Sequence, residues 1–479
     1  MGTRYDFDLA VIGGGAAGLT VAAGAARLGV KVLLVEREGR LGGDCLHFGC
    51  VPSKTLLATA RARRTMARAG EFGLPGVAVP PVDFALVRRR IEDVIAGIQA
   101  HDSPERFRAL GAEVRFGQAR FLDDHVVALG GKRVSAARFV IATGSRAAKP
   151  DIPGLSEAGY ATNRELFSLE KLPESLLILG GGPMAVEMGQ AFARLGSKVT
   201  LVQRSPHILS REDPDLAEVL EARLAAEGVD LRLGARVVSV TPGTLKTVHI
   251  EQGGRGEALQ AALILVAMGR TPNLEELGLD AAGVVHTKKG LVLDARLRTS
   301  RRHIFGAGDV TGEHLFTHAA GYEGGLAVAN AVFRLPKKAD YRLLPRCVYT
   351  EPELAVVGMS ETGAARAGIT VDVLTEPFSG NDRARAENEA GGLVKIVLGR
   401  RGRPLGVGIV GPGAGELVAE WVAALGGGVG LGTLAGAVHP YPTLAETSKR
   451  AAGRRLEAKL FSRLTRRALR LLYGYRGAK

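Results

Sequence analysis

Residues 8–18 read DLAVIGGGAAG, a short apolar run followed by a glycine-rich turn. A continuous apolar run is typical of a strand buried in a parallel sheet, and the alanine-rich residues up to 28 predict a helix. Gly13 allows a tight turn, Gly15 lets the backbone approach a pyrophosphate, and Gly18 allows the helix to pack on the strand. Because free N–H groups at a helix start attract phosphate, this stretch predicts a dinucleotide-binding unit.

The next predicted strand, residues 31–35, ends at Glu36. A carboxylate in this position accepts hydrogen bonds from the ribose hydroxyl groups of a dinucleotide. The alternative is an ordinary tight turn between a strand and a helix, which does not account for the acid at the end of the second strand. We therefore expect Glu36 to bind ribose.

The strand–turn–helix–strand pattern returns over residues 176–202, with Gly180, Gly182 and Ala185 at the three glycine positions of the turn. The chain is therefore expected to contain two nucleotide-binding domains.

The second unit ends without an acid, because Gln203 and Arg204 stand where the first unit has Glu36. A carboxylate would repel a 2′-phosphate, whereas an arginine pairs with it. Arg204, helped by Arg211, therefore favours NADPH over NADH. The alternative is that Arg204 is a solvated loop residue.

The length of 479 residues predicts about three domains. A proline-flanked boundary at 337–345 precedes strands at 394–398 and 406–410 and a helix at 415–425, which predict a mixed α+β domain. We expect an α/β fold with two Rossmann-like domains and this third one. The expected segments are 1–155 and 279–340 for the first domain, 156–278 for the second, and 341–479 for the third.

The composition is that of a globular protein, with 46% hydrophobic and 23% charged residues. Three cysteines are too few for a disulfide-stapled secreted domain, and the N-terminus lacks the basic and small-residue features of a signal peptide. A cytoplasmic location is therefore expected. Cys347, which stands apart from the other two, is expected to be a small buried side chain.

Cys45 and Cys50 lie five residues apart in CLHFGC, shortly after the first nucleotide-binding unit. Such a pair can be brought into disulfide geometry at the start of a helix, where the helix dipole also lowers thiol pKa. One alternative is half of a zinc site, but no second Cys/His cluster completes the ligand set, so we expect no metal. The other is a pair of buried, inert thiols.

Residues 42–54, GGDCLHFGCVPSK, resemble the active-site motif of the flavoprotein disulfide reductases. This group of pyridine nucleotide–disulfide oxidoreductases contains glutathione reductase, dihydrolipoamide dehydrogenase and mercuric reductase. The resemblance covers almost the whole chain. It implies FAD in the first domain, NAD(P)H in the second, and a C-terminal dimerisation domain that forms a homodimer with an active site shared between subunits.

The resemblance also implies roles for individual residues. Asp309 would bind the ribityl region of FAD, and Thr143 with Gly144 would form a loop on the dinucleotide. Lys54 would lie by the flavin N5 and pair with Glu187, although the sequence alone leaves these two as unrelated surface charges. The remaining cofactor-binding residues implied are Gly43, Gly269, Arg270, Gly308 and His318.

The implied reaction passes a hydride from NADPH through flavin to a Cys45–Cys50 disulfide and then to a small disulfide or another acceptor. Cys50 would be the thiolate next to the flavin, and Cys45 would attack the acceptor.

The chain departs from the family pattern near its C-terminus. Disulfide-reducing members carry a catalytic histidine five residues before a glutamate, but here Tyr441 stands five residues before Glu446, and His439 lies two residues earlier. A tyrosine, with a pKa of about 10, is a poor general base at neutral pH. Either His439 reaches the site through an altered turn, or Tyr441 holds the position with different chemistry; His439 can also be a structural residue.

A tyrosine at this position is similar to the pattern of mercuric reductases, and so is the motif REDP at residues 211–214. However, residues 471–479 lack the C-terminal cysteine pair of those enzymes. The sequence therefore predicts a mercuric-reductase-like NADPH-dependent disulfide oxidoreductase. One alternative is a dihydrolipoamide dehydrogenase that uses NAD. The other is a flavin-bearing binding protein recruited through a basic tail.

That tail holds much of the net charge of +14, since residues 451–479 contain nine basic residues and one acid. Leu460, Leu464, Ala468 and Leu471 are spaced as on one face of a helix. The tail is expected to pack on the dimer with a solvated basic face, membrane-surface contact being the less favoured use. We expect no nucleic-acid partner.

Overall fold

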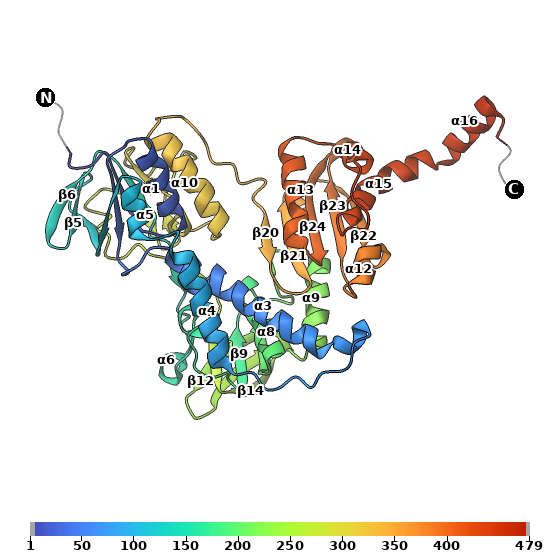
Figure 1. Ribbon diagram of the computed structural model, residues 1–479, viewed down its shortest axis with the longest axis horizontal. Coiled ribbons are helices and arrows are strands. Elements are labelled where there is room, and N and C mark those ends of the chain that lie inside the picture. Colours follow the sequence, from blue (N-terminus) through green and yellow to red (C-terminus); the bar gives the residue numbers. More distant parts are fainter. Residues whose placement is uncertain (1–4, 476–479) are drawn as a thin grey trace.

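Two parallel sheets and one antiparallel sheet form the centres of three domains in the computed structural model, which describes residues 5–475 (Figure 1). The first sheet has the order β19-β7-β1-β2-β3 and is parallel throughout. Its strands are β1 (Leu9–Ile12), β2 (Val32–Glu36), β3 (Ala112–Phe116), β7 (Phe139–Ile141) and β19 (Ile304–Gly306). Because β19 pairs with β7, the chain returns to the first domain after completing the second.

The second parallel sheet has the order β11-β10-β9-β15. Its strands are β9 (Ser175–Leu179), β10 (Lys198–Gln203), β11 (Asp230–Leu233) and β15 (Leu263–Val266). The helix between β9 and β10 is α8 (Pro183–Leu195), which begins three residues before the helix that the sequence predicts over 186–195. Proline is suited to this first helical position because its missing N–H would have no partner there.

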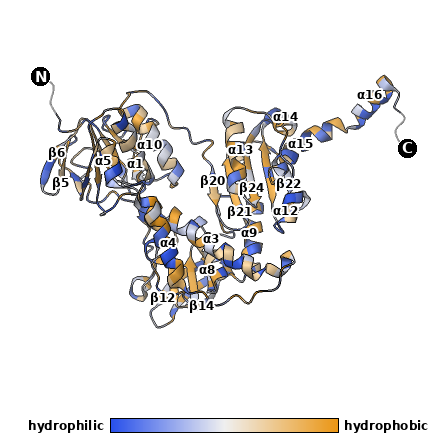
Figure 2. Ribbon diagram, viewed as in Figure 1, coloured by the Kyte–Doolittle hydropathy of each residue, from blue (hydrophilic) through white to orange (hydrophobic). Residues whose placement is uncertain are grey.

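The third domain is built on the antiparallel sheet β20-β21-β24-β23-β22. Its strands are β20 (Arg346–Val348), β21 (Glu353–Gly358), β22 (Asp372–Pro377), β23 (Leu393–Leu398) and β24 (Pro404–Gly411). Helix α13 (Ala414–Gly426) packs on it through the fully buried Trp421. Hydrophobic residues concentrate on the strands of these sheets (Figure 2).

The smaller elements surround these sheets. The additional strands are β4 (Ala119–Phe121), β5 (Val126–Leu129), β6 (Lys132–Ser135), β8 (Ser145–Ala147), β12 (Ala235–Thr241), β13 (Lys246–Gln252), β14 (Arg255–Ala261), β16 (Arg270–Pro272), β17 (His286–Thr287) and β18 (Gly290–Leu291). The additional helices are α1 (Ala16–Arg27), α2 (Gly43–Phe48), α5 (Pro104–Ala109), α6 (Leu155–Ala158), α7 (Asn163–Leu166), α9 (Pro214–Ala226), α10 (Thr317–Ala331), α11 (Glu361–Arg366), α12 (Asp382–Ala386) and α14 (Leu431–Gly436). None of the helices between residues 5 and 475 combines the length and the apolar character needed to cross a membrane.

The C-terminal tail forms two helices, which corrects the single helix expected from its leucine spacing. Leu460 ends α15 (Glu446–Leu460), whereas the later leucines lie on α16 (Arg463–Tyr473). The helical backbone is interrupted at Ser462. The hydroxyl of Ser462 caps α16 by accepting a hydrogen bond from the N–H of Thr465 at 3.2 Å.

Two long helices leave the first domain and pack on the second. These are α3 (Cys50–Ala67) and α4 (Phe84–Gln99), and α3 lies along α8 (Figure 1). Leu56 and Phe84 share one hydrophobic core with Phe192 of α8 and Val348 of the third domain. The helix that begins at Cys50 is therefore held by all three domains.

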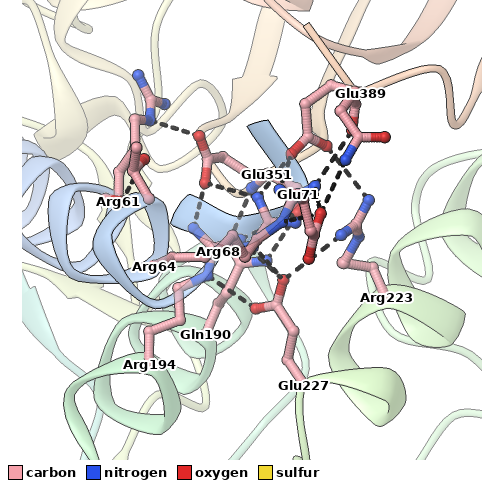
Figure 3. Close-up of polar contacts among 12 residues, drawn as sticks. Arg61, Arg64, Arg68, Glu71, Gln190, Arg194, Arg223, Glu227, Glu351 and Glu389 are labelled. Atoms are coloured by element: carbon pink, nitrogen blue, oxygen red, sulfur yellow. Dashed lines mark hydrogen bonds and ion pairs between the residues drawn. The ribbon is translucent and has the colours of Figure 1, made fainter. Parts of the chain in front are cut away.

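A network of charged and polar side chains strengthens this junction. Its members are Arg61, Arg64, Arg68, Glu71, Gln190, Arg194, Arg223, Glu227, Glu351 and Glu389 (Figure 3). Arg64 of α3 pairs with Glu389 of the third domain at 2.8 Å and with Glu227 of the second at 3.4 Å. Arg194 of α8, with 5% of its side chain exposed, binds both oxygens of Glu227 at 2.8 and 2.9 Å and also pairs with Glu351.

We expect Arg194→Met to lower the free energy of unfolding by about 2 kcal/mol, because it removes two charge-assisted hydrogen bonds to Glu227 and a pair to Glu351 at a buried position. The matched control is Arg236→Met, which removes a pair to Glu251 whose side chains are 63% and 47% exposed and costs less than about 1 kcal/mol. Calorimetry of both variants measures the fall in Tm. Equal falls would show that the network does not stabilise the junction.

Candidate functional site

One cleft of about 1590 Å³ is lined by both dinucleotide turns and by the cysteine pair. Most of the site residues expected from the sequence lie on its wall. They are Gly13, Gly15, Glu36, Gly43, Cys45, Cys50, Lys54, Thr143, Gly144, Gly180, Gly182, Glu187, Arg204, Arg211, Gly269, Arg270, Gly308, Asp309 and His318. Gly18 and Ala185 lie behind the turns, in α1 and α8, and the C-terminal candidates His439, Tyr441 and Glu446 do not line the cleft of this chain.

The first turn requires glycine where β1 ends. Gly13 has φ +114°, and a Cβ there would lie 2.2 Å from the carbonyl oxygen of Ala142. Helix α1 then begins at Ala16 without a side-chain cap on Gly15 and without an acid in its first turn. Because the first turn of α1 contains no acidic side chain, its free N–H groups are not opposed by local negative charge. The glycine-rich turn before the helix therefore fits a pyrophosphate.

Glu36 lies at the end of β2, on the cleft wall, and is 8% exposed. Its two carboxylate oxygens accept the N–H groups of Gly14 at 2.6 Å and of Glu38 at 2.8 Å. A carboxylate oxygen can accept more than one hydrogen bond, so each retains capacity for a ribose hydroxyl group.

The second turn repeats this geometry. Gly180 has φ +117°, and a Cβ there would lie 2.4 Å from the carbonyl oxygen of Ala267. Ala185 is fully buried in α8, so the third position of this turn accommodates a methyl group.

Arg204 and Arg211 are exposed on the cleft wall beside the second turn. No ion pair of either residue with an acid occurs within residues 5–475, whereas the neighbouring Glu212 is bound by Arg346 at 3.0 and 2.9 Å. The two arginines therefore leave positive charge available to a phosphate group.

The cysteine pair spans the junction of two helices, with Cys45 in α2 and Cys50 as the first residue of α3. The thiols are free, and the Sγ of Cys50 lies 3.1 Å from the hydroxyl oxygen of Thr317. A hydrogen bond from Cys45, another with Thr317 and the charge of Lys54 together lower the pKa of Cys50 to about 6 against the effect of burial. The bond to Cys50 and burial raise the pKa of Cys45. Cys50 is therefore the thiolate of the pair.

Lys54 lies one turn further along α3 and pairs with Glu187 of α8 at 2.8 Å, as the resemblance implies. Glu187, whose side chain is 5% exposed, also accepts the N–H of Tyr349 at 3.0 Å. The Nζ of Lys54 lies 4.4 Å from the centre of the Tyr349 ring. Tyr349, which comes from the third domain, completes the site, although no feature of the sequence pointed to it.

Polar residues of separate segments meet at Asp309. Its carboxylate accepts the hydroxyl of Ser145 at 2.5 Å and lies 3.5 Å from the Nε of Arg270. Arg270 also donates to Asp44 at 2.8 Å, so its guanidinium is bound to carboxylates of the first domain. Burial raises the pKa of Asp309. The cluster brings hydrogen-bonding groups to the cleft wall, as binding of a ribityl chain requires.

Glu323 supports this loop from within α10, where it is 1% exposed. Its carboxylate accepts the N–H of Gly308 at 2.6 Å and the hydroxyl of Tyr341 at 2.8 Å, and burial raises its pKa to about 7. On the same helix, the Nε2 of His318 lies 2.8 Å from the carbonyl oxygen of Pro345. Both residues therefore connect the cleft to the segment that leads into the third domain.

The C-terminal candidates differ in exposure. The Nε2 of His439 lies 3.0 Å from Glu420, and its side chain is 10% exposed. Tyr441 is 70% exposed and donates to Asp382 at 3.1 Å, which raises the pKa of the phenol. Glu446 has one buried carboxylate oxygen without a hydrogen-bond partner among the described residues. Tyr441 is therefore the more exposed candidate, and it carries its proton at neutral pH.

Two further groups look reactive from the sequence or the geometry. Cys347 lines the cleft half-buried, and burial raises its pKa to about 12, so it is a poor nucleophile. Asp124, His125 and His303 lie together in the first domain, but the two imidazole rings stack at 4.1 Å with 9° between their planes. Parallel rings cannot direct in-plane lone pairs at one ion, so the cluster supports no metal assignment.

Thr317, Ser145 and Glu323 were missed because their role depends on chain segments far apart in sequence. Thr317 contacts a cysteine 267 residues away, and Ser145 contacts an acid 164 residues away. A threonine next to the candidate His318 was the only local signal for the first, and nothing in the alanine- and glycine-rich α10 marked Glu323.

Comparisons with known proteins give matches along nearly the whole chain. A family model described as pyridine nucleotide-disulphide oxidoreductase matches residues 7–325, and one described as the dimerisation domain of that family matches residues 344–452. The mercuric reductase of Bacillus cereus is 35% identical over 451 residues, which cover 94% of this chain and 71% of the relative. The dihydrolipoyl dehydrogenase of Thermus scotoductus is 37% identical over 460 residues, covering 93% and 96%. The HOCl-induced flavoprotein disulfide reductase RclA of Escherichia coli has a TM-score of 0.84 at 28% identity, covering 94% of this chain and 100% of that one.

We expect Thr317→Val to raise the pKa of Cys50 by about one unit, because a hydrogen bond to a charged group is worth about 1.5–3 kcal/mol. Alkylation of the reduced protein by iodoacetamide should rise with pH through a midpoint of about 6 in the unaltered chain. The midpoint should move upward in Thr317→Val and stay in place in Thr317→Ser, which keeps the hydroxyl. Identical midpoints in all three would remove Thr317 from the site.

Proposed function

Because this chain belongs to the pyridine nucleotide-disulphide oxidoreductase family, we propose that it transfers a hydride from NADPH, through FAD, to a Cys45–Cys50 disulfide and then to a small acceptor. Gly13, Gly15, Glu36 and Asp309 would hold FAD, which when bound would supply two-electron transfer between the nicotinamide and the disulfide. The observation that carries the proposal is the position of Cys50, which contacts Thr317 and lies one helical turn from the Lys54–Glu187 pair, in a cleft shared with both dinucleotide turns.

The two cysteines take different parts in this reaction. Opening the disulfide by two electrons leaves one thiolate, on Cys50, and one sulfur that holds a proton, on Cys45. Cys50 contacts Thr317 of α10 in the first domain, which supports its assignment to the FAD side. Once deprotonated, Cys45 attacks one sulfur of the acceptor disulfide and forms a mixed disulfide, while the other acceptor sulfur leaves as a thiolate. Cys50 then attacks Cys45, which re-forms the Cys45–Cys50 disulfide and releases the second acceptor thiolate.

Tyr441 is suited to donate a hydrogen bond to the leaving thiolate. Its phenol is exposed, and because Asp382 raises its pKa the phenol holds its proton more tightly than a thiol does, so it stabilises the departing charge without giving up the proton. Since the dimerisation domain brings two copies together in this family, we infer that Tyr441 serves the cleft of the partner subunit. His439, held by Glu420, is a supporting residue of this turn.

The charge beside the second turn supports NADPH as the reductant. Arg204 and Arg211 lie on the cleft wall without an acidic partner in the described part of the chain. The acceptor is less defined, because the relatives include mercuric reductases, dihydrolipoyl dehydrogenases and RclA, of which a Cu(II) complex has been solved. An NADPH-oxidation screen over low-molecular-weight disulfides, Hg(II) and Cu(II), with dihydrolipoamide and NAD as the reverse assay, separates these acceptors. Turnover of dihydrolipoamide with NAD alone would favour the dehydrogenase alternative.

We expect Cys50→Ser to lose the long-wavelength absorbance that limited NADPH produces when a thiolate lies against flavin, together with acceptor reduction. Flavin content measures whether the variant still folds and binds FAD. The matched control is Cys347→Ser, which should keep both signals because the Cys347 thiol is protonated at neutral pH. Absence of the band in the unaltered protein would contradict the proposal.

We expect Arg204→Glu to lower the NADPH/NADH ratio of kcat/KM by about tenfold or more, because it exchanges attraction of the 2′-phosphate for repulsion. Arg302→Glu makes the same change of charge on an exposed turn outside the cleft and should leave the ratio unaltered. A constant ratio in Arg204→Glu would show that this arginine does not select the nucleotide.

A further inference from the structure

The C-terminal helix α16 has no buried residue. The helix before it has its buried residues, Thr447, Ser448, Ala451 and Ala452, in its first half. Arg454 and Arg455, further along, pair with Glu376 and Asp372 of the third domain. The match to the family's dimerisation domain ends at residue 452, and beyond this point the chain runs away from the body of the protein (Figure 1). The last part of the described chain is thus an addition to the catalytic fold.

The two faces of α16 differ sharply. Leu464, Leu471 and Leu472 lie within one face, since residues three, four, seven and eight apart share a side of a helix, and they are 79%, 87% and 73% exposed. The opposite face carries arginines, and the helix contains no acid. These arginines are Arg463, Arg466, Arg467 and Arg470. Figure 2 shows hydrophobic and hydrophilic residues side by side on a helix that no neighbouring element covers.

Aromatic side chains flank this helix. Phe461 precedes it and is 71% exposed, and the rings of Tyr473 and Tyr475 stack at 5.9 Å at its end with 66% and 62% exposure. A helix of 11 residues is only marginally stable in water, so α16 requires a surface that covers its leucines.

We propose that α16 binds the surface of an anionic lipid bilayer and lies in its plane. The leucines and Phe461 enter the boundary between headgroups and acyl chains, the arginines pair with lipid phosphates, and the tyrosines lie at the headgroup level. Nucleic acid would match the arginines but leave the leucine face in water. The lipid surface is the partner that satisfies both faces.

A second copy of the chain is a less suitable partner for α16. A second copy could cover the leucine face of α16, but with a net charge of +14 on each chain it offers the arginine face no excess of negative charge. Arg476 and Lys479 add to the positive charge of the tail by sequence, although they lie outside the described residues. Anionic lipid, in contrast, offers a continuous negative surface to each arginine.

The test is flotation of the full-length, flavin-loaded protein with vesicles of phosphatidylglycerol and phosphatidylcholine in equal amounts, against vesicles of phosphatidylcholine alone. We expect binding to the anionic vesicles that weakens as salt is added. Leu464→Glu/Leu471→Glu should lose at least about tenfold in affinity, because two leucines no longer enter the bilayer. Arg466→Gln/Arg467→Gln should lose about 30-fold on the anionic vesicles.

The matched control is Leu74→Glu/Leu86→Glu, which places the same two charges at leucines that are 61% and 58% exposed elsewhere, and should bind as the unaltered protein does. Unaltered NADPH oxidation in the α16 variants would show that the effect is confined to binding. Equal binding to both vesicles, or full binding by the leucine variant, would overturn the proposal. So would a shift of that variant from dimer to monomer in sedimentation, or duplex DNA binding that exceeds vesicle binding and ignores the leucines.

Discussion

The buried ion pairs along α3 are the constraint on which the site depends. Arg64 and Arg194 bind carboxylates from the second and third domains within one network (Figure 3), and α3 begins at Cys50. Because a charge left without its partner in such a place is costly, the network favours one position of the helix. The thiolate of Cys50 and the ammonium of Lys54 are thereby held at a fixed place between the two dinucleotide turns.

The electrostatics of the cleft follow from that placement. The Cys50 thiolate is stabilised by the hydrogen bond from Cys45, by that with Thr317 and by the charge of Lys54. Its position at a helix start adds the effect of the helix dipole. Glu187 restrains Lys54 and opposes this stabilisation, so the pair tunes the thiolate rather than simply adding positive charge. The same thiolate keeps Cys45 protonated, which makes the two sulfurs chemically different although they lie five residues apart.

The local patterns were predictable because each is formed by residues close in sequence. The two glycine turns, Glu36 and the cysteine motif could be identified from spacing, and α8 differs from expectation only at its first turn. Thr317, Tyr349 and Glu323 could not be identified, because each becomes part of the site only when α10 and the segment after β20 contact other parts of the tertiary structure. The tail was predicted as one helix because the spacing of its leucines carries no information about the helix cap at Ser462.

The sequence by itself determined which chemistry this chain carries: two nucleotide-binding turns, a pair of cysteines, an arginine in place of an acid, and a tyrosine in place of a histidine. Those features depend on residue type and on short spacing. They can be identified from sequence because turns and helices require particular residues at fixed intervals. The tertiary structure supplied the physical basis for the charge on Cys50 and for the pair of Lys54 with Glu187, which the resemblance had implied. It alone decided which of His439 and Tyr441 is exposed. The physical reason is that pKa and exposure depend on burial and on partners contributed by distant segments.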